Sequence, residues 1–248
     1  MNIQPIADMT KPEPKRRVRS LDYVLRREIV GKYQYHVLRQ ARGILHVGAN
    51  MGQEAAQYDR NGLDVLWIEP IDAVFAELQA NIAAYPRQRA IKALVTDQDG
   101  SPHTLHIASN GGSSSSILEL GQHTDIFPNV TFVRDMAVVG VTLTTLVERE
   151  KIDIAKYDML LLDTQGSELL VLKGAIPLLQ NFRFVQVEAA DFEAYKGCAK
   201  VHEIDALMAT QGFVSCHRKR TSQHPDGGQY FEITYGRERP NWWARLKV

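Results

Sequence analysis

Gly48 and Gly52 stand four residues apart in the stretch ILHVGANMGQE, directly after a short apolar run. Glycine has no Cβ, so the backbone can turn sharply there and a ligand can approach it closely. The residues from Met51 onward predict the start of a helix, whose free N–H groups would point toward such a ligand. On its own, this spacing is equally typical of a tight turn that binds nothing.

Glu69 ends the next apolar run, VLWIEP. An acidic side chain at the end of that strand can accept hydrogen bonds from both hydroxyls of a ribose. Alone, Glu69 would be interpreted as a solvated strand end, but together with the glycine turn it predicts a nucleoside-containing cofactor. Val95, Thr96 and Asp97 follow a further apolar run and would border the adenine, although Asp97 could equally begin a turn.

Asn50 favours S-adenosylmethionine (SAM) over a nicotinamide dinucleotide as that cofactor. The dinucleotide fingerprint G-x-G-x-x-G needs its second glycine to make room for a pyrophosphate, and this chain has Asn50 at that position. SAM has no phosphate and tolerates the asparagine. An NAD-dependent oxidoreductase on a similar sheet is the alternative.

The elements that would position these residues alternate between strands and helices. Apolar patterning predicts strands within 43–48, 63–70, 89–100, 103–109, 130–150, 157–166, 183–192, 213–220 and 229–236, and helices within 50–62, 71–86, 167–180 and 201–212. The segment 130–150 would also contain a short helix. This alternation predicts an α/β fold with a doubly wound, mainly parallel sheet covered by helices on both faces. The last two strands predict an antiparallel C-terminal hairpin.

Four regions are expected along the chain. Residues 1–20 are rich in proline and charge and predict a flexible basic tail, and 21–43 predict an N-terminal helical extension. One domain would span 44–236, with a C-terminal tail over 237–248. The two tryptophans of that tail would pack on the domain or support a homodimer.

Five segments resemble, in order, the FkbM family of SAM-dependent methyltransferases: HVGANMGQE, WIEPIDAVFAELQANI, SSSSIL, LLLDTQGSELLVLKGA and VQVEAADFEAYKG. The resemblance runs from about Ile44 to Tyr235, and DTQGSELLVLKGA is its most specific part. It implies a class I methyltransferase (Rossmann-like) fold with an antiparallel C-terminal hairpin, and methyl transfer to a hydroxyl of a sugar or small natural-product acceptor. Combined with the glycine turn, it predicts cofactor contacts at His46, Gly48, Ala49, Asn50, Gly52, Gln53, Glu69, Pro70, Thr96, Asp97, Ser115, Ser116 and Asp163.

His46 departs from the family pattern, because many members carry an acidic residue before V-G-A-N that helps to hold the methionine part of the cofactor. A neutral imidazole could still form a hydrogen bond, but it would not offset the ammonium charge. Which residue pairs with that ammonium stays open.

Asp163 and Glu188 are the main candidates for the catalytic base, because each ends a strand at the predicted cofactor edge. Either could orient or deprotonate an acceptor hydroxyl. Asp163 could instead cap the helix that starts near Ser167, or bind the methionine end of the cofactor. His123 is a third candidate base, with a surface histidine as the alternative. No ligand spacing demands a metal, so none is expected.

Charge and composition narrow the remaining choices. Lys+Arg and Asp+Glu both total 29, and this balance is not typical of a nucleic-acid-binding protein, so RNA methylation is disfavoured. With two cysteines and no signal-peptide or membrane-span pattern, we expect a cytoplasmic protein without an integral membrane segment. The alternative from another class is a non-catalytic SAM-binding partner in a biosynthetic assembly, which would release no S-adenosylhomocysteine (SAH).

Overall fold

A computed structural model describes residues 37–237 of the chain. The basic tail expected at 1–20, the helical extension up to residue 36 and the C-terminal tail beyond Arg237 lie outside the described residues. Within the described part, no helix is both long enough and apolar enough to cross a membrane.

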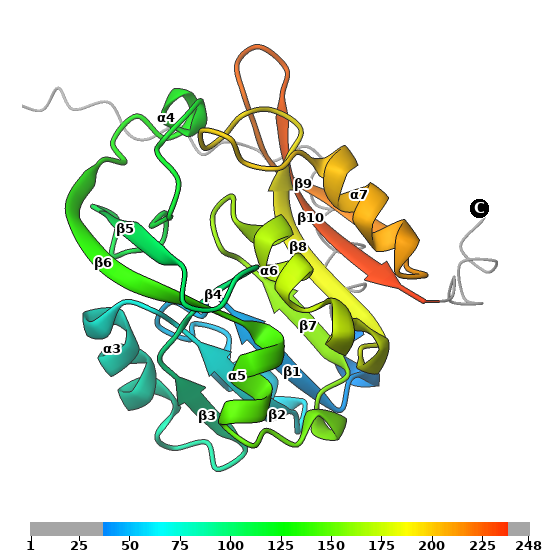
Figure 1. Cartoon of the computed structure of the whole chain (residues 1–248). Helices are drawn as coiled ribbons and strands as arrows, with labels where there is room; N and C mark the ends of the chain where they lie inside the picture. Colours follow the sequence, from blue (N-terminus) through cyan, green and yellow to red (C-terminus); the bar gives the residue numbers. More distant parts are fainter. Residues whose placement is uncertain (1–36, 238–248) are drawn as a thin grey trace, which may run out of the picture.

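A seven-stranded sheet forms the centre of the part that the structure describes (Figure 1). Its strand order is β3-β2-β1-β7-β8-β10-β9, with bounds β1 Gly43–Val47, β2 Asp64–Ile68, β3 Gln88–Ile91, β7 Met159–Leu162, β8 Phe184–Ala190, β9 Val214–Gln223 and β10 Gln229–Gly236. Strands β1, β2, β3, β7 and β8 pair in parallel, and β10 is antiparallel to both β8 and β9. The predicted mainly parallel sheet with an antiparallel C-terminal hairpin is therefore confirmed.

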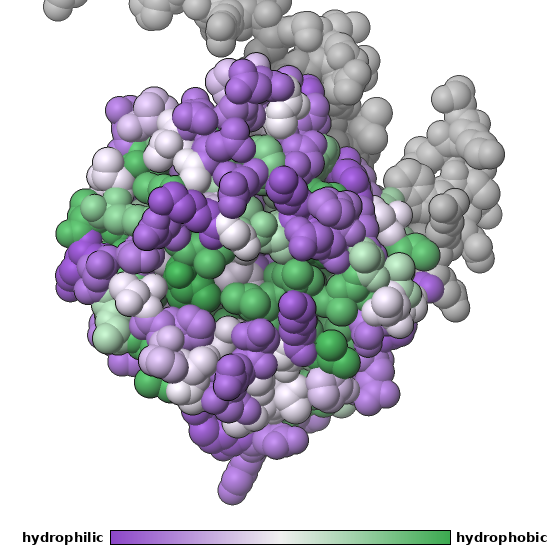
Figure 2. All heavy atoms as spheres, turned by 45° about the horizontal axis from the view of Figure 1, so that its top comes forward, coloured by the Kyte–Doolittle hydropathy of each residue, from purple (hydrophilic) through white to green (hydrophobic). Residues whose placement is uncertain are grey.

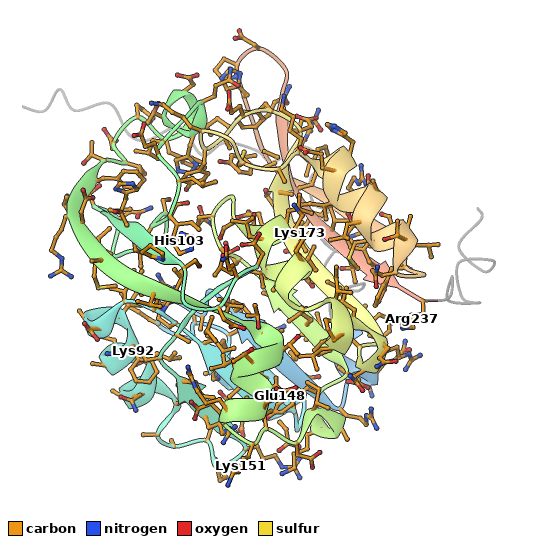
Figure 3. The ribbon with its side chains drawn as sticks, viewed as in Figure 1. Lys92, His103, Glu148, Lys151, Lys173 and Arg237 are labelled. Carbon is orange, nitrogen blue, oxygen red and sulfur yellow. The ribbon has the colours of Figure 1, made fainter. Side chains whose placement is uncertain are left out.

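Helices cover both faces of this sheet, as the alternation predicted. They are α2 (Ala55–Arg60), α3 (Asp72–Ile82), α5 (Leu143–Arg149), α6 (Glu168–Gly174) and α7 (Val201–Thr210). One face buries Leu45 and Leu160 against α5, α6 and α7, and the other buries Ile44 and Trp67 against α2 and α3. Charged side chains such as Glu148 on α5 and Lys173 on α6 lie on the outer surface (Figure 3). These helices are therefore amphipathic, with their apolar stripe on the sheet.

The helix predicted over 167–180 is interrupted. α6 ends at Gly174, and a 3-10 helix follows over Ile176–Asn181 with Pro177 in its first turn. Proline has no N–H to donate to the preceding helical turn, so the α-helical ladder cannot continue through it. A further 3-10 helix covers Ile154–Lys156.

The strand predicted over 89–100 is divided, and its second part leaves the central sheet. β3 ends at Ile91, and β4 (Leu94–Thr96) joins β5 (Pro102–Ala108) and β6 (Phe132–Thr142) in a separate three-stranded sheet of order β4-β6-β5. A Cβ on Gly174 would lie 2.2 Å from the carbonyl oxygen of Thr96. The backbone of β4 thus packs directly on the end of α6, which requires a residue without a side chain there.

The three-stranded sheet packs beside the start of α3 (Figure 1). Leu105 and Ile107 of β5 are buried against Ile71 and Val74. The loop from β5 to β6 contains the short helix α4 (His123–Ile126), where the sequence predicted only a polar loop. This sheet and its loop supply one wall of the site described next.

Candidate functional site

A cavity of about 370 Å³ opens at the carboxyl ends of β1, β2 and β7. The strand order reverses here, because β2 lies on one side of β1 and β7 lies on the other. Open α/β sheets bind their ligands at such switch points, and the volume is within the usual range for a small-molecule site. Figure 2 brings this upper part of the molecule forward and shows hydrophobic residues around a hollow near its middle.

The glycine turn forms the floor of the cavity. Gly48 has a φ of 81°, and a Cβ on it would lie 1.9 Å from the carbonyl oxygen of Asp163. Four of the residues predicted to contact a cofactor line the cavity, namely Gly48, Ala49, Asn50 and Gln53. Gly52 lies behind them, where an added Cβ would meet the side chain of Leu78 on α3 at 2.7 Å. Gly52 therefore supports the turn without lining the cavity.

Glu69 lines the cavity at the end of β2 and is only 4% exposed. Its two carboxylate oxygens accept hydrogen bonds from the backbone N–H groups of Asn50 and Ile71, both at 3.0 Å. Burial raises the pKa of Glu69 from its ordinary 4.5 to about 7. Because each carboxylate oxygen can accept more than one hydrogen bond, Glu69 still has acceptor positions for two hydroxyl groups.

An apolar wall adjoins Glu69. Its lining residues are Pro70, Ile71, Ala93, Leu94, Val95, Leu105 and Ile117. Thr96 is fully buried and Asp97 is exposed, and neither lines the cavity, because the chain has already turned from β3 into β4. The sequence reasoning therefore found Pro70 and Val95 but missed the contribution of β5. The apolar alternation of Leu105 and Ile107 was the signal for it.

The serine run after β5 closes the cavity on the same side. Ser115 and Ser116 both line it. The Ser115 hydroxyl accepts a hydrogen bond from the backbone N–H of Ala108 at 2.9 Å, and the Ser116 hydroxyl donates to the backbone carbonyl of Gln165 at 2.7 Å. These bonds hold the run against both β5 and the turn after β7.

His46 lies at the other end of the cavity and is 4% exposed. Its ring stacks on Trp67, with the centroids 4.9 Å apart, and Tyr58 lies 6.3 Å away. Burial lowers its pKa to about 3, so the imidazole is neutral. Its buried Nδ1 has no hydrogen-bond partner among the described residues. A cavity wall with an unsatisfied polar atom of this kind is suited to a polar ligand.

Asp163 lines the cavity directly after β7, whereas Glu188 on β8 faces a much smaller void behind it. The amide Nε2 of Gln165 joins them, donating to Asp163 at 2.6 Å and to Glu188 at 3.3 Å. Burial raises the pKa of both carboxyls, and the charge on Asp163 raises that of Glu188 further. The two groups therefore act as one coupled acidic pair.

Asp163 does not cap the helix that follows it. The backbone N–H groups of Thr164 and Gly166 donate instead to the carboxylate of Glu168, at 2.8 and 3.0 Å. α6 begins at Glu168 without a side-chain cap hydrogen bond, and the Asp163 carboxylate bonds to Gln165 instead, so the capping alternative is excluded and Asp163 lines the cavity.

His123 is buried, so its interpretation as a surface histidine is wrong. Its Nδ1 lies 2.6 Å from the hydroxyl of Tyr230, and its ring is 5.1 Å from that of Tyr195. It does not line the cavity. As for metals, the described residues contain no group of three or more His, Cys, Asp or Glu side chains placed to bind one ion.

Glu168 makes the stability of the folded protein depend on pH. Its burial raises the pKa from 4.5 to about 7, so the unfolded chain releases this proton at lower pH than the folded one. The resulting stabilisation is complete below about pH 4.5 and is lost as the pH rises through about 7. In urea titrations, the unfolding free energy of Glu168→Gln minus that of the unmodified protein should therefore become more positive as the pH rises from about 4.5 to about 7.

The matched control for this prediction is Glu148→Gln, because Glu148 is exposed on α5. This variant removes one acidic charge from the surface and leaves the buried carboxyls in place, so it controls for the loss of that charge. A difference for Glu168→Gln that is constant from about pH 4.5 to 7 would contradict the raised pKa.

Comparisons with known proteins give one family match. Residues 46–215 match the model of the methyltransferase FkbM domain. No curated protein sequence matches the chain significantly. Among solved structures, magnesium protoporphyrin IX methyltransferase from Synechocystis PCC 6803 with bound SAH is 11% identical, with 87% of this chain and 84% of that chain covered and a TM-score of 0.47. TrmK from M. capricolum with SAH is 9% identical, with coverages of 79% and 62% and a TM-score of 0.45.

Proposed function

The chain belongs to the FkbM methyltransferase family and uses SAM as its methyl donor, and from this we propose that it methylates a hydroxyl oxygen of a sugar or small natural-product acceptor. The observation that carries the proposal is the position of Asp163. Its carboxylate lies at the wall of the same cavity that contains the glycine turn and Glu69. A cofactor site and a potential base for a hydroxyl group are therefore adjacent.

The residues around the cavity fit SAM in three respects. Glu69 retains acceptor positions for the ribose hydroxyls, and the apolar wall from Pro70 to Ile117 suits an adenine. The unpartnered Nδ1 of His46 and the amide of Gln53 supply polar contacts for the methionine part. SAM brings a methyl group bonded to a positively charged sulfur, which a nucleophilic oxygen can displace. Placed at this edge, that charge would also favour the ionised form of Asp163.

In the proposed reaction, Asp163 accepts the proton of the acceptor hydroxyl. The oxygen forms a bond to the methyl carbon while the carbon–sulfur bond breaks, and the bonding electron pair stays with sulfur, giving SAH. Glu188 keeps its proton while Asp163 is ionised, because two neighbouring buried carboxyls resist holding two charges. His123 packs against Tyr195 and Tyr230 outside the cavity, and Thr96 and Asp97 do not line it, so these three residues have no part in the proposed reaction.

The cysteines bear on where this reaction takes place. Cys198 is a free, buried thiol, and a reduced thiol is typical of a reducing compartment such as the cytoplasm. We place the enzyme there, acting on a small acceptor and not on nucleic acid, and with a homodimer as a further possibility for its assembly.

Calorimetric titration with SAH, with NAD as the parallel ligand, tests the cofactor site. We expect one-to-one binding of SAH and none of NAD. Glu69→Gln should weaken SAH binding roughly 10- to 100-fold, because hydrogen bonds to a charged group are lost. The matched control is Glu77→Gln, an exposed residue on α3 that should leave the affinity unchanged. Equal affinities in the two variants would remove Glu69 from the site.

A panel of sugars and natural-product alcohols, incubated with the enzyme and SAM, tests the acceptor class. Each compound is paired with its O-methylated form, in which the reactive hydroxyl is already blocked. Release of SAH with the free hydroxyl and not with the blocked form supports O-methylation. SAH binding without any release across the panel would favour the alternative, a non-catalytic partner in an assembly.

A further inference from the structure

The turn after β7 holds an unusual backbone conformation. Gln165 has a φ of 53°, which is the left-handed region that side chains other than glycine rarely adopt. The next residue, Gly166, has a φ of 100° and packs against Tyr195, whose Cβ would lie 3.2 Å from a Cβ built on the glycine. Glycine or asparagine would fit position 165 with less strain. The chain has a glutamine at position 165 in spite of this backbone strain, which indicates that the glutamine side chain has a role of its own.

All polar atoms of the Gln165 side chain are engaged. Its Nε2 donates to Asp163 at 2.6 Å and to Glu188 at 3.3 Å, and its Oε1 accepts from the hydroxyl of Tyr195 at 2.8 Å. Because the ionised carboxylate of Asp163 can only accept, the –NH2 group of Gln165 must face it. Tyr195 then satisfies the remaining oxygen and keeps the amide in that orientation. The hydroxyl of Ser116 holds the backbone carbonyl of Gln165 from the cavity side.

We propose that Gln165 is a positioning residue for methyl transfer: its amide holds the Asp163 carboxylate at the cavity wall and ties it to Glu188, so that Asp163 receives the acceptor proton. This inference rests on the proposed function. A carboxylate that accepts a short hydrogen bond from a fixed amide is stabilised in its ionised form. The second oxygen of Asp163 makes no side-chain hydrogen bond among those of the described residues and is free for the substrate.

The other ionisable groups that act on Asp163 and Glu188 oppose ionisation. Within the described residues they are all carboxyls: Glu54 before α2, Glu69 after β2, Glu168 on α6 and Glu232 on β10. Burial and these charges raise the pKa of both carboxyls, and the hydrogen bonds from Gln165 lower it. In this part of the chain, the amide of Gln165 is thus the main group that favours an ionised Asp163.

The test is a carbon-13 NMR titration of the side-chain carboxyls in the full-length protein bound to SAH. The signals are assigned with Asp163→Asn and Glu188→Gln. In the unmodified protein, Asp163 should ionise before Glu188 as the pH rises. Gln165→Met keeps the length of the side chain but cannot donate, and it should move the Asp163 midpoint upward by about one pH unit.

Two further variants keep the experiment decisive. Tyr195→Phe leaves Gln165 in place but removes the hydroxyl that orients it, and should give a smaller shift in the same direction even if Gln165→Met fails to fold. Gln180→Met is the matched control, since Gln180 is exposed far along the following 3-10 helix. It should leave both midpoints unchanged.

Two results would overturn the role of Gln165. One is an unchanged Asp163 midpoint in both Gln165→Met and Tyr195→Phe, and the other is ionisation of Glu188 before Asp163 in the unmodified protein. Either result, with SAH binding and acceptor-dependent SAH release intact, rejects only the role of Gln165. Failure of the unmodified protein to bind SAH would instead reject the proposed function itself.

Discussion

Replacing Gly48 by alanine is expected to abolish SAH binding and to lower the unfolding free energy by roughly 2–5 kcal/mol. The new Cβ would lie 1.9 Å from the carbonyl oxygen of Asp163, and this contact is with backbone, which cannot rotate away. The turn after β1 and the turn after β7 would have to separate. Both line the cavity, so stability and ligand binding should be lost together.

The control for Gly48→Ala is Gly100→Ala. Gly100 has a similar φ of 74°, but a Cβ on it would meet nothing within 4 Å. Gly100→Ala therefore introduces the backbone strain without the steric clash. We expect it to lower the unfolding free energy by about 1 kcal/mol and to leave the SAH affinity unchanged. Urea unfolding and calorimetric titration measure the two effects. Equal stability losses in the two variants would show that the close approach of the turns is not important.

Asp163→Asn is expected to lower turnover about 100- to 1000-fold while SAH affinity stays within a few-fold of the unmodified enzyme. Asparagine has nearly the same shape, and its side-chain oxygen can still accept the hydrogen bond from Gln165. It cannot take up a proton at neutral pH, so only the chemical step should suffer. The measurement is the initial rate of SAH release with whichever acceptor the panel identifies, together with SAH titration.

The comparison that separates the candidate bases is Glu188→Gln. Since Glu188 is already protonated when Asp163 is ionised, its replacement should lower turnover far less. Asp59→Asn, an exposed residue on α2, controls for the loss of one acidic charge. A large loss in Glu188→Gln with little effect in Asp163→Asn would reverse the assignment.

The pKa of Asp163 also sets a direction for the pH dependence of turnover. Burial raises this pKa, so the carboxylate takes up its proton at a higher pH than an exposed aspartate does. Turnover should therefore fall on the acid side as Asp163 becomes protonated. This loss should be absent from the residual activity of Asp163→Asn, which has no carboxyl to titrate.

Much of the fold could be predicted from local pattern. Strands β1, β2 and β7 are mostly apolar runs because both of their faces are buried, and a run of that kind is visible without any neighbour. The glycine turn and Glu69 follow such runs directly, so their place at one edge of the sheet followed from strand direction alone. The antiparallel hairpin was recognisable because no helix separates its two strands.

The errors in the predicted fold arose where the partner of a segment decided its structure. Thr96 and Asp97 follow an apolar stretch that looks like one strand, but the chain leaves the central sheet at Ile91 to pair with β6. Pairing between distant segments has no local signature, so the cavity wall supplied by Leu105 was missed. His123 looked like a surface residue within a polar loop, yet Tyr195 and Tyr230 bury it.

The sequence by itself determined the family, the parallel sheet, the cofactor edge and the acidic residues that end its strands, because each depends on residue type and short-range spacing. Only the tertiary structure decided which acid faces the cavity: Asp163 directly follows β7 as predicted, whereas β8 continues to Ala190, so the prediction that Glu188 ends its strand was wrong. Their difference comes from the amide of Gln165 between them, from the separate small void that Glu188 lines and from the serine run packed across the turn. These contacts join residues far apart in the chain, and no local pattern encodes the distances between them.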